Sequence, residues 1–352
     1  KMLGSVAALV IPAIGAVMGV SLVVIMLGVL VSRLVVCVLY AIAIRHALPE
    51  LRWVRSRDWS LLKRLVSFGR WVLVSNTVSP LLVYFDRFAL VSIAGLAAAG
   101  FYTAPYEGVV RLLLIPVSLF GTLLPALTAA EAARDGTRFT QMVSASERVL
   151  VPLMALPLAV VFVFAPEILG VWLGAQYAAQ SAVALRWLAA GVFANSLANP
   201  LFVALYAKDR PDLPAKFHLL ELAIHVPLTI YLIHAFGIAG AAAAWTARST
   251  LDMWLLLWGA ARVSQAPVSS IAGGRALHTT AALVLLVIGF GVSKVLATVS
   301  IFGAVFAVAV TSIAFLALSW RSILGDVERS AITGTVASYL RLAPVGRRDG
   351  AL

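Results

Sequence analysis

Charged side chains are scarce in this sequence. Only 12% of its 352 residues are Asp, Glu, Lys or Arg, whereas 62% are hydrophobic. A water-soluble domain carries about 25% charged residues and roughly 45–50% apolar ones. So few charges cannot cover a surface that faces water, and most of the surface must therefore face lipid.

Cysteine is nearly absent as well. The single cysteine, Cys37, lies in an apolar run and has no partner for an intramolecular disulfide. The chain begins with Lys1 rather than Met, without the basic segment, short apolar core and cleavage site of a signal peptide. We expect a fragment or a processed start.

Motifs for catalysis and for metal binding are also missing. We find no phosphate-binding loop, no Cys/His metal spacing, no nucleophile motif and no Asp-rich loop at a membrane face. The sequence therefore predicts no catalytic residue, no bound metal and no cofactor, and favours a protein that is not an enzyme.

What the sequence has in abundance is apolar stretches of membrane-spanning length. A spanning helix needs about 20 mostly apolar residues. Residues 3–44 hold two crossings, the first of them short, with a turn near residues 15–19. Eight further crossings are predicted at about residues 68–92, 100–127, 149–173, 182–206, 217–236, 240–261, 277–292 and 298–320. The sequence therefore predicts an all-α, polytopic transmembrane bundle of about ten helices.

The predicted loops alternate between basic and nearly uncharged. Most of the 27 Lys and Arg residues lie in one set of loops and at the chain ends, whereas the opposite loops contain only Lys294. The positive-inside rule predicts that the basic loops and the C-terminus are cytoplasmic. This distribution accounts for the net charge of +12 without nucleic acid as a partner. In the polar tail, Ile332, Val336, Tyr339 and Leu340 share one helical face, which is typical of a helix that lies on the membrane surface. A frayed end is the equal alternative.

The third crossing carries a polar stripe. Asn76, Ser79, Val83 and Asp86 recur at i, i+3, i+7 and i+10, which places them on one face of a helix. Pro80 beside them loosens the backbone. Polar groups inside a membrane are costly and usually face a partner or a wet cavity.

The next crossing adds opposite charges at the same depth. Glu107 and Arg111 are spaced to pair along the helix. Asp86 and Glu107 each lie about five or six residues outward of their helix midpoints, roughly 8–9 Å above the midplane. One charge cluster is therefore predicted, with two tyrosines close by: Asp86, Arg87, Glu107, Arg111, Tyr102 and Tyr106. A structural clamp between the helices and the lining of a hydrophilic cavity both remain open, and the polar stripe favours the cavity.

Other intramembrane polar groups are weaker signals. Arg33 either pairs with a helix outside this chain or faces a cavity. Arg248 and Asp252, at i and i+4, favour a structural ion pair. Three residues near one helix end, His218, Glu221 and His225, share a face, where they could bind a metal, relay protons or reach lipid headgroups, and headgroups are favoured. Asn195 and Asn199 are typical of contacts that hold helices together.

Residues 68–90 and 97–127 resemble the seventh and eighth helices of bacterial polysaccharide flippases. The shared features are SN-x-x-SP, the D-R pair and Y-T-A-P-Y-E. These O-antigen and teichoic-acid type transporters belong to the multidrug/oligosaccharidyl-lipid/polysaccharide (MOP) superfamily. The resemblance extends more weakly over about residues 21–262.

The resemblance implies a division of the chain, because the family fold has two lobes of six helices and sometimes two more. Residues 1–44 would be the last two helices of an N-terminal lobe whose first four are missing. The remaining parts would be a cytoplasmic basic loop (45–66), a complete six-helix lobe (67–262), two extra helices (263–320) and a cytoplasmic tail (321–352). In the family the first two helices line half of the central cavity.

The resemblance also implies a function. Such a protein moves an undecaprenyl-pyrophosphate-linked oligosaccharide across the bacterial cytoplasmic membrane by alternating access, among membrane lipids and beside polymerase and chain-length proteins. The implied roles are sugar contacts from Asn76, Ser79, Tyr102 and Tyr106, pyrophosphate contacts from Arg87, Arg111 and Arg33, and arginine pairing or coupling to protons or sodium by Asp86 and Glu107.

Four other functions are alternatives. A lipid II flippase and a drug or metabolite exporter belong to the same superfamily. A membrane glycosyltransferase or polymerase is disfavoured because the uncharged loops are too short for its catalytic motifs. A scaffold that binds partner helices is the last alternative.

Overall fold

The computed structural model describes residues 10–15, 17–47, 59–274 and 276–342, and the regular elements among them are all helices. The chain divides into two compact units, residues 1–62 and 63–352, which are described separately. Eight of the described helices are long and apolar enough to cross a membrane. The prediction of a polytopic all-α membrane bundle is confirmed.

The first unit contains α2 (Leu22–Ala47), preceded by helical residues 10–15 and a turn. Gly19 in this turn has a φ of 66°, which glycine adopts without strain. A Cβ on Gly15 would lie 2.5 Å from the Ile25 side chain, so the chain passes close to α2 here. The turn matches the predicted one, whereas most of the predicted first crossing lies outside the described residues.

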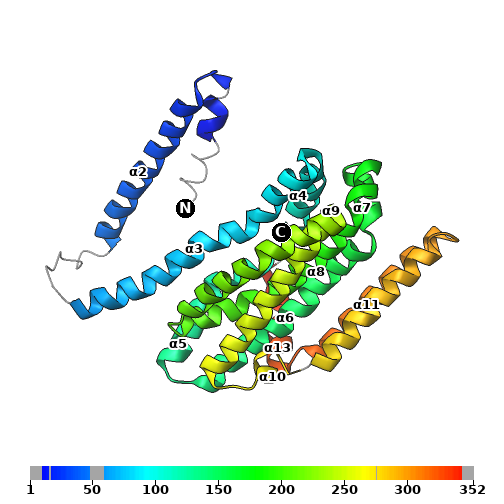
Figure 1. Ribbon diagram of the computed structural model, residues 1–352. Helices are drawn as coiled ribbons and strands as arrows, with labels where there is room; N and C mark the ends of the chain where they lie inside the picture. The colour runs from blue at the N-terminus through cyan, green and yellow to red at the C-terminus, as the bar shows by residue number, and fades with distance from the viewer. Residues whose placement is uncertain (1–9, 16, 48–58, 275, 343–352) are drawn as a thin grey trace, which may run out of the picture. The chain divides into compact units, whose positions relative to one another are not determined.

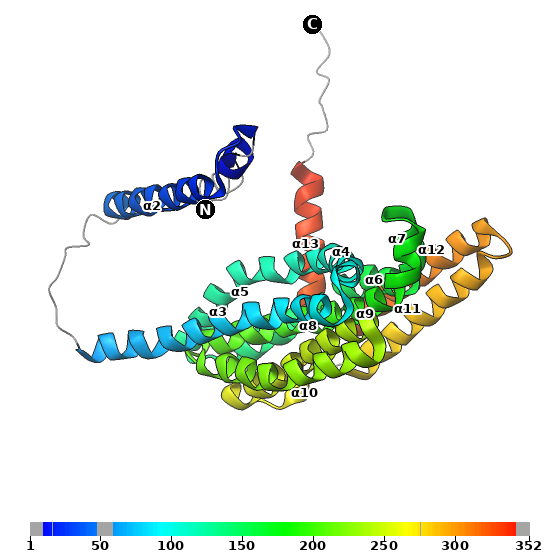
Figure 2. The same ribbon diagram turned by 45° about the horizontal axis from the view of Figure 1, so that its top comes forward.

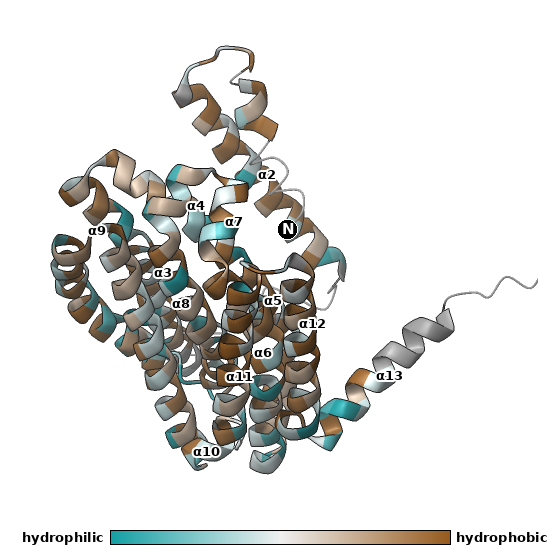
Figure 3. Ribbon diagram, turned by 90° about the vertical axis from the view of Figure 1, so that its right-hand side faces the viewer, coloured by the Kyte–Doolittle hydropathy of each residue, from teal (hydrophilic) through white to brown (hydrophobic). Residues whose placement is uncertain are grey.

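The second unit begins within α3, at residue 63, and contains the helices that follow, which are drawn in Figures 1 and 2. Figure 3 shows them as largely hydrophobic along their length, with hydrophilic residues at several turns and ends. The bounds are α3 (Trp59–Ala94), α4 (Leu96–Val110), η1 (Arg111–Leu113), α5 (Leu114–Ala132), α6 (Gly136–Val163), α7 (Ala165–Trp172), α8 (Ala175–Ala207), α9 (Asp212–Ser264), α10 (Val268–Ile271), α11 (Ala276–Leu296), α12 (Ile301–Leu318), η2 (Ser319–Ile323) and α13 (Asp326–Leu342).

Glycines form three tight turns at one end of this unit. Gly95 separates α3 from α4 with a φ of 87°, and Gly174 precedes α8 with a φ of 97°. Gly237 (φ 57°, ψ −128°) divides α9 into two helices, residues 212–236 and 238–264. Residues other than glycine rarely adopt these backbone angles, so a glycine at each position allows the chain to reverse within a short turn. The predicted short connection between the crossings at residues 217–236 and 240–261 is therefore present, and Gly237 is its turning residue.

Several helix boundaries differ from the prediction, most of all the starts of α3 and α6. α3 begins at Trp59, so residues 59–66, predicted as part of the basic loop, are helical. α6 begins at Gly136, well before the predicted residue 149, because Asp135 caps it by accepting a hydrogen bond from the Arg138 backbone N–H at 2.9 Å. The predicted crossing also breaks at Phe164, and Pro166 opens the short helix α7.

Helix α8 lies at the centre of the six-helix part of the unit. It packs against α4, α5, α6, α7 and α9, and two thirds of its most apolar segment is buried. Small residues allow this close packing. A Cβ on Gly191 would lie 2.5 Å from the ring of Trp245, which is itself almost fully buried.

Ion pairs attach the last helices to this bundle. Lys294 of α11 lies 2.7 Å from Glu167 of α7. Glu328 at the start of α13 pairs with Arg148 of α6, and the Arg329 guanidinium donates to the carbonyls of Trp320, Arg321 and Leu324. Burial opposes ionisation of Glu328, but the hydrogen bond from Arg148 lowers the pKa of this carboxyl below its usual value. Of the two alternatives left open for the tail, the structure contains a helix, and its first turn is held by charge-assisted bonds.

Candidate functional site

Helix α3 turns its polar stripe gradually into the bundle. Asn76 is exposed, Ser79 is partly buried and Asp86 is fully buried. Ser75, Val78, Leu82, Asp86 and Leu90 form the face that packs inward. The stripe predicted from the spacing therefore runs from an accessible surface into the interior of the lobe.

Asp86 is held by two hydrogen bonds. The Tyr102 hydroxyl of α4 donates to Asp86 Oδ2, and the Arg87 backbone N–H donates to Oδ1 at 2.8 Å. Asp86 and Tyr102 are both fully buried. The structure thus places these two predicted cavity residues behind the surface, where they join α3 to α4.

Arg87 lies between this buried bond and the surface. Its Nη2 is 2.9 Å from Glu107 Oε1, and its guanidinium lies over the Tyr106 ring with 4.4 Å to the centroid. Glu107 Oε2 is 4.0 Å from Arg111 Nη2. The exposed fraction of the side chain rises from 14% at Arg87 to 48% at Glu107 and 73% at Arg111.

The structure therefore brings together the four charged residues that equal depth predicted. Opposite charges alternate outward from Asp86 to Arg87, Glu107 and Arg111, with Tyr102 and Tyr106 packed beside them. Arg33, the remaining predicted site residue, lies on an exposed face of α2 in the first unit.

A polar cavity of about 250 Å³ opens between α3, α8 and α9. Asn76 and Ser79, predicted from the stripe, both line it. Phe202 forms one wall, where its ring stacks on Tyr206 and lies parallel to the His218 ring. The lining residues are Ser75, Asn76, Ser79, Asn195, Ala198, Asn199, Phe202, His218, Asp252 and Leu256. Asn195 and Asn199, predicted to hold helices together, thus also face this space.

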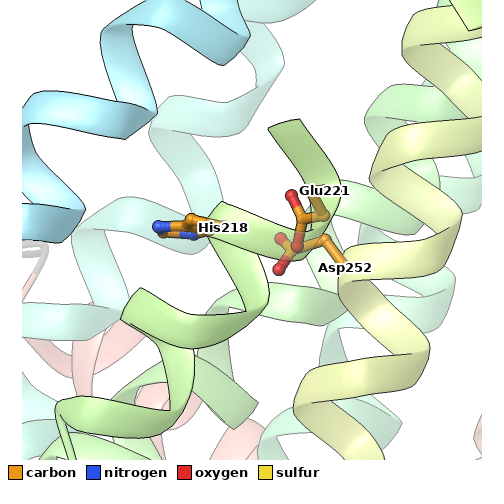
Figure 4. A group of neighbouring side chains, drawn as sticks. All are labelled: His218, Glu221 and Asp252. Carbon is orange, nitrogen blue, oxygen red and sulfur yellow. The ribbon is translucent and has the colours of Figure 1, made fainter. Parts of the chain in front are cut away.

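A buried acidic pair lies next to the cavity. Glu221 and Asp252 face one another from the two halves of α9, as Figure 4 shows, and potential ligand atoms of these two and His218 lie within 4.8 Å of one another. Glu221 is fully buried and Asp252 nearly so. Arg248 Nη1 lies 3.3 Å from Glu221 Oε2.

Two interpretations of the sequence are corrected here. Arg248 pairs across the hairpin with Glu221, whereas the i,i+4 spacing predicted Asp252 as its partner. Contact with lipid headgroups, preferred for His218, Glu221 and His225, is wrong because all three are buried. Glu221 and Asp252 lie nearly equal numbers of residues from Gly237, so the one-residue turn could have predicted that they meet.

His218, Glu221 and Asp252 are the described residues that could hold a metal ion. Imidazole and carboxylate are ligands for several divalent metals. The guanidinium of Arg248 beside Glu221 opposes a second cation at that position, since like charges repel strongly in a buried site.

Aromatic rings connect the two groups of charges. Tyr106 packs edge-on against Trp245 at 5.4 Å between centroids, and the Arg248 guanidinium lies 5.9 Å from the Trp245 centroid. The polar seam, defined as Arg111, Glu107, Arg87, Asp86, Tyr106, Trp245, Arg248, Glu221 and Asp252, thus runs from the exposed face to the cavity. Periodicity along one helix does not reveal the whole seam, because three of its links join different helices: Arg87 with Glu107, Tyr106 with Trp245, and Arg248 with Glu221.

Water should reach the cavity residues of α3. Cysteines introduced at Asn76 or Ser79, in a chain whose exposed Cys37 is replaced by serine, are expected to react readily with a water-soluble maleimide. The thiolate that reacts forms only where water solvates it. Leu82→Cys, at an almost fully buried position of the same helix, is the matched control and should stay unlabelled. Equal protection of all three cysteines would contradict a wet cavity.

Comparison with known proteins gives the family. A family profile described as "Lipid II flippase MurJ" matches residues 6–318. A Shigella flexneri protein, named provisionally as an O-antigen transporter, is 34% identical over 201 residues, which are 57% of this chain and 47% of that protein. The chain thus spans about half the length of this curated relative. The extent of the profile match establishes that this multi-pass membrane protein belongs to the MurJ flippase family.

Proposed function

We propose that this chain carries the lipid-linked oligosaccharide through the membrane as part of a flippase, with an undecaprenyl-pyrophosphate carrier as the lipid. The observation that carries the proposal is the series Arg87, Glu107 and Arg111, in which opposite charges reach an exposed face of a membrane-embedded lobe. An exposed cation at membrane depth is costly unless it has a polar partner. A pyrophosphate is a partner of the right charge.

The contacts of Arg87 and Arg111 allow these arginines to exchange Glu107 for a pyrophosphate. The contact between Arg111 and Glu107 is long, at 4.0 Å, and the Arg111 side chain is largely exposed. This ion pair is therefore weak. Guanidinium groups bind phosphate oxygens through two parallel hydrogen bonds, which are shorter and stronger than neutral ones. Glu107 keeps Arg87 and Arg111 paired in the empty state, and the pyrophosphate replaces it when the substrate arrives.

The glycan requires a hydrogen-bonding surface. Asn76 and Ser79 supply an amide and a hydroxyl at the opening of the polar cavity, on the same helix as Arg87. Sugar hydroxyls exchange bonds with such groups at little cost, because both sides offer donors and acceptors. Tyr102 and Tyr106 support this surface from behind rather than contacting the sugar, since both are buried.

The remaining assignments follow the same proposal. Residues 67–262 form one lobe of an alternating-access transporter, which works in the bacterial cytoplasmic membrane with its basic loops and C-terminus in the cytoplasm. A lipid II flippase is the second candidate, favoured by the family profile, and its substrate carries the same pyrophosphate.

The test replaces Arg111 in the intact protein. Arg111→Ala is expected to abolish transfer of the lipid-linked oligosaccharide to the outer leaflet at an unchanged protein level, whereas Arg111→Lys retains part of it because the charge remains. Transfer is measured as surface polysaccharide in cells that lack their own transporter. Arg134→Ala, at an exposed position of the α5–α6 turn, is the control.

Two outcomes separate the alternatives. Normal export by Arg111→Ala would show that the charge series is a structural clamp, against the proposal. Rescue of cells depleted of their lipid II flippase, without export of other glycans, would favour the lipid II candidate.

A further inference from the structure

The acidic pair inside α9 is not explained by packing alone. Glu221 and Asp252 are buried together in the lobe interior, and in Figure 4 their carboxyl groups point toward one another. Glu221 Oε1 and Asp252 Oδ1 are each buried without a hydrogen-bond partner. An ionised carboxylate only accepts hydrogen bonds, so two ionised groups cannot satisfy each other. If one of them is protonated, it can donate to its neighbour.

The balance of charge around Glu221 and Asp252 also favours one protonated carboxyl group. Arg248 is the cation that contacts the pair, at 3.3 Å from Glu221. Two carboxylates and one guanidinium leave one unbalanced negative charge in a low-dielectric interior, where such a charge is very costly. One added proton makes the group neutral. Like charges at close range in other proteins are relieved in this way, with one proton shared between two acids.

Among the described residues, no cationic side chain other than Arg248 forms an ion pair with Glu221 or Asp252. On α9 itself, His218 lines the cavity and His225 is buried one turn beyond Glu221. From α3, Asp86 interacts with Arg248 over a longer distance, and its own charge is balanced by Arg87. The groups that α4 and α8 bring are neutral: the Tyr106 hydroxyl from α4, and the amides of Asn195 and Asn199 from α8.

A metal ion fits the arrangement less well than a proton. Any metal bound to Glu221 would lie beside the Arg248 guanidinium, which already occupies one side of that carboxylate. In Figure 4 the His218 ring also points sideways from the two carboxyl groups instead of closing a third side. A shared proton needs only the two oxygens.

We propose that Glu221 and Asp252 hold one proton between them, and that this proton exchanges with water through the cavity between α3, α8 and α9. Asp252 and His218 both line that cavity, so the outer carboxyl and an imidazole lie on the exit route. When the proton leaves, the pair gains a negative charge beside Arg248, and Arg248 is drawn toward it. Arg248 packs on Trp245 and Trp245 on Tyr106, so the change reaches the Arg87 contact.

The proton site itself does not depend on what the lobe transports, whereas coupling of this proton to substrate movement rests on the proposed function. The primary test therefore measures protonation directly. The intact protein, reconstituted in lipid nanodiscs at neutral pH, is examined by infrared spectroscopy for the carbonyl stretch of protonated carboxylic acids. Glu221→Gln and Asp252→Asn are each expected to remove the same band, because the acid left in either variant is ionised beside Arg248.

The double variant is expected to remove no more than either single one, which distinguishes one shared proton from two separate ones. Glu131→Gln, which alters a partly exposed acid paired with Lys208, should leave the spectrum of protonated acids unchanged. If a variant does not fold, the same band is followed in wild-type protein with ¹³C-labelled aspartate or glutamate, where the label must shift it.

Two results would overturn the proposal. One is the absence of any band that depends on Glu221 and Asp252, which would mean that both are ionised. The other is stoichiometric binding of sodium, zinc or manganese ions to the wild-type protein at neutral pH, lost in Asp252→Asn, which would make the pair a metal site. Neither result depends on transport, so failure here is distinct from failure of the Arg111 experiment.

Discussion

Asp86→Ala is expected to lower the free energy of unfolding of the lobe by about 3 kcal/mol, because a hydrogen bond to a buried charged group contributes about 1.5–3 kcal/mol and the abandoned partner stays unsatisfied. The partner is the Tyr102 hydroxyl, which is fully buried. Unfolding by SDS in mixed micelles, followed by circular dichroism, measures the loss.

A double variant shows whether the stability loss in Asp86→Ala comes from the unsatisfied Tyr102 hydroxyl. With Tyr102→Phe in the same chain, no hydroxyl remains to be satisfied, so the combined loss should be smaller than the sum of the single losses by about 1–2 kcal/mol. Tyr231→Phe, at an exposed tyrosine of α9, is the control and should change little. Additive losses would show that Asp86 does not depend on Tyr102.

Gly240→Ala is expected to destabilise the lobe by more than about 3 kcal/mol, the upper range for overpacking a well-packed interior. A Cβ at this position would lie 1.9 Å from the Leu232 carbonyl oxygen and 2.4 Å from its carbon. These are backbone atoms that no rotamer change can move, so the two halves of α9 must separate. The same unfolding measurement applies.

Gly100→Ala is the matched control for this substitution. Gly100 lies inside α4, and a Cβ there would meet nothing within 4 Å. Replacing glycine by alanine in a helix then stabilises it by roughly 0.5–1 kcal/mol. Equal behaviour of the two variants would contradict the close contact between the halves of α9.

The fold was predictable because its main signals are local. Twenty apolar residues in a row indicate a spanning helix, and Gly237 between two such runs indicates a turn. The break at Phe164 was missed because the sequence is largely apolar on both sides of it, although Pro166 signals a new helix start. The early start of α6 depends on the Asp135 cap, a signal in the sequence that the hydropathy pattern hides.

The sequence was enough to predict how deep in the membrane the site residues lie, but not the direction in which their side chains face. Counting residues from the helix midpoints places Asp86 and Glu107 at one level, and the contacts of Arg87 agree with this. Which way each side chain faces depends on how the helices are rotated about their axes. In α3 and α9 apolar residues lie on every side of the helix, so periodicity gives no strongly preferred face. The burial of Asp86 and the contact of Glu221 with Arg248 therefore required the structure.

The single-glycine reversals at Gly95 and Gly237 also limit how this protein can be handled. Where the chain reverses within one residue, almost no loop is exposed for a protease to cleave or for an antibody or a bacteriophage protein to bind. A label or an affinity tag inserted there would force apart two paired helices. Reporters for this lobe belong at the opposite end, where the connections around Arg134 and Arg210 leave exposed side chains to receive them.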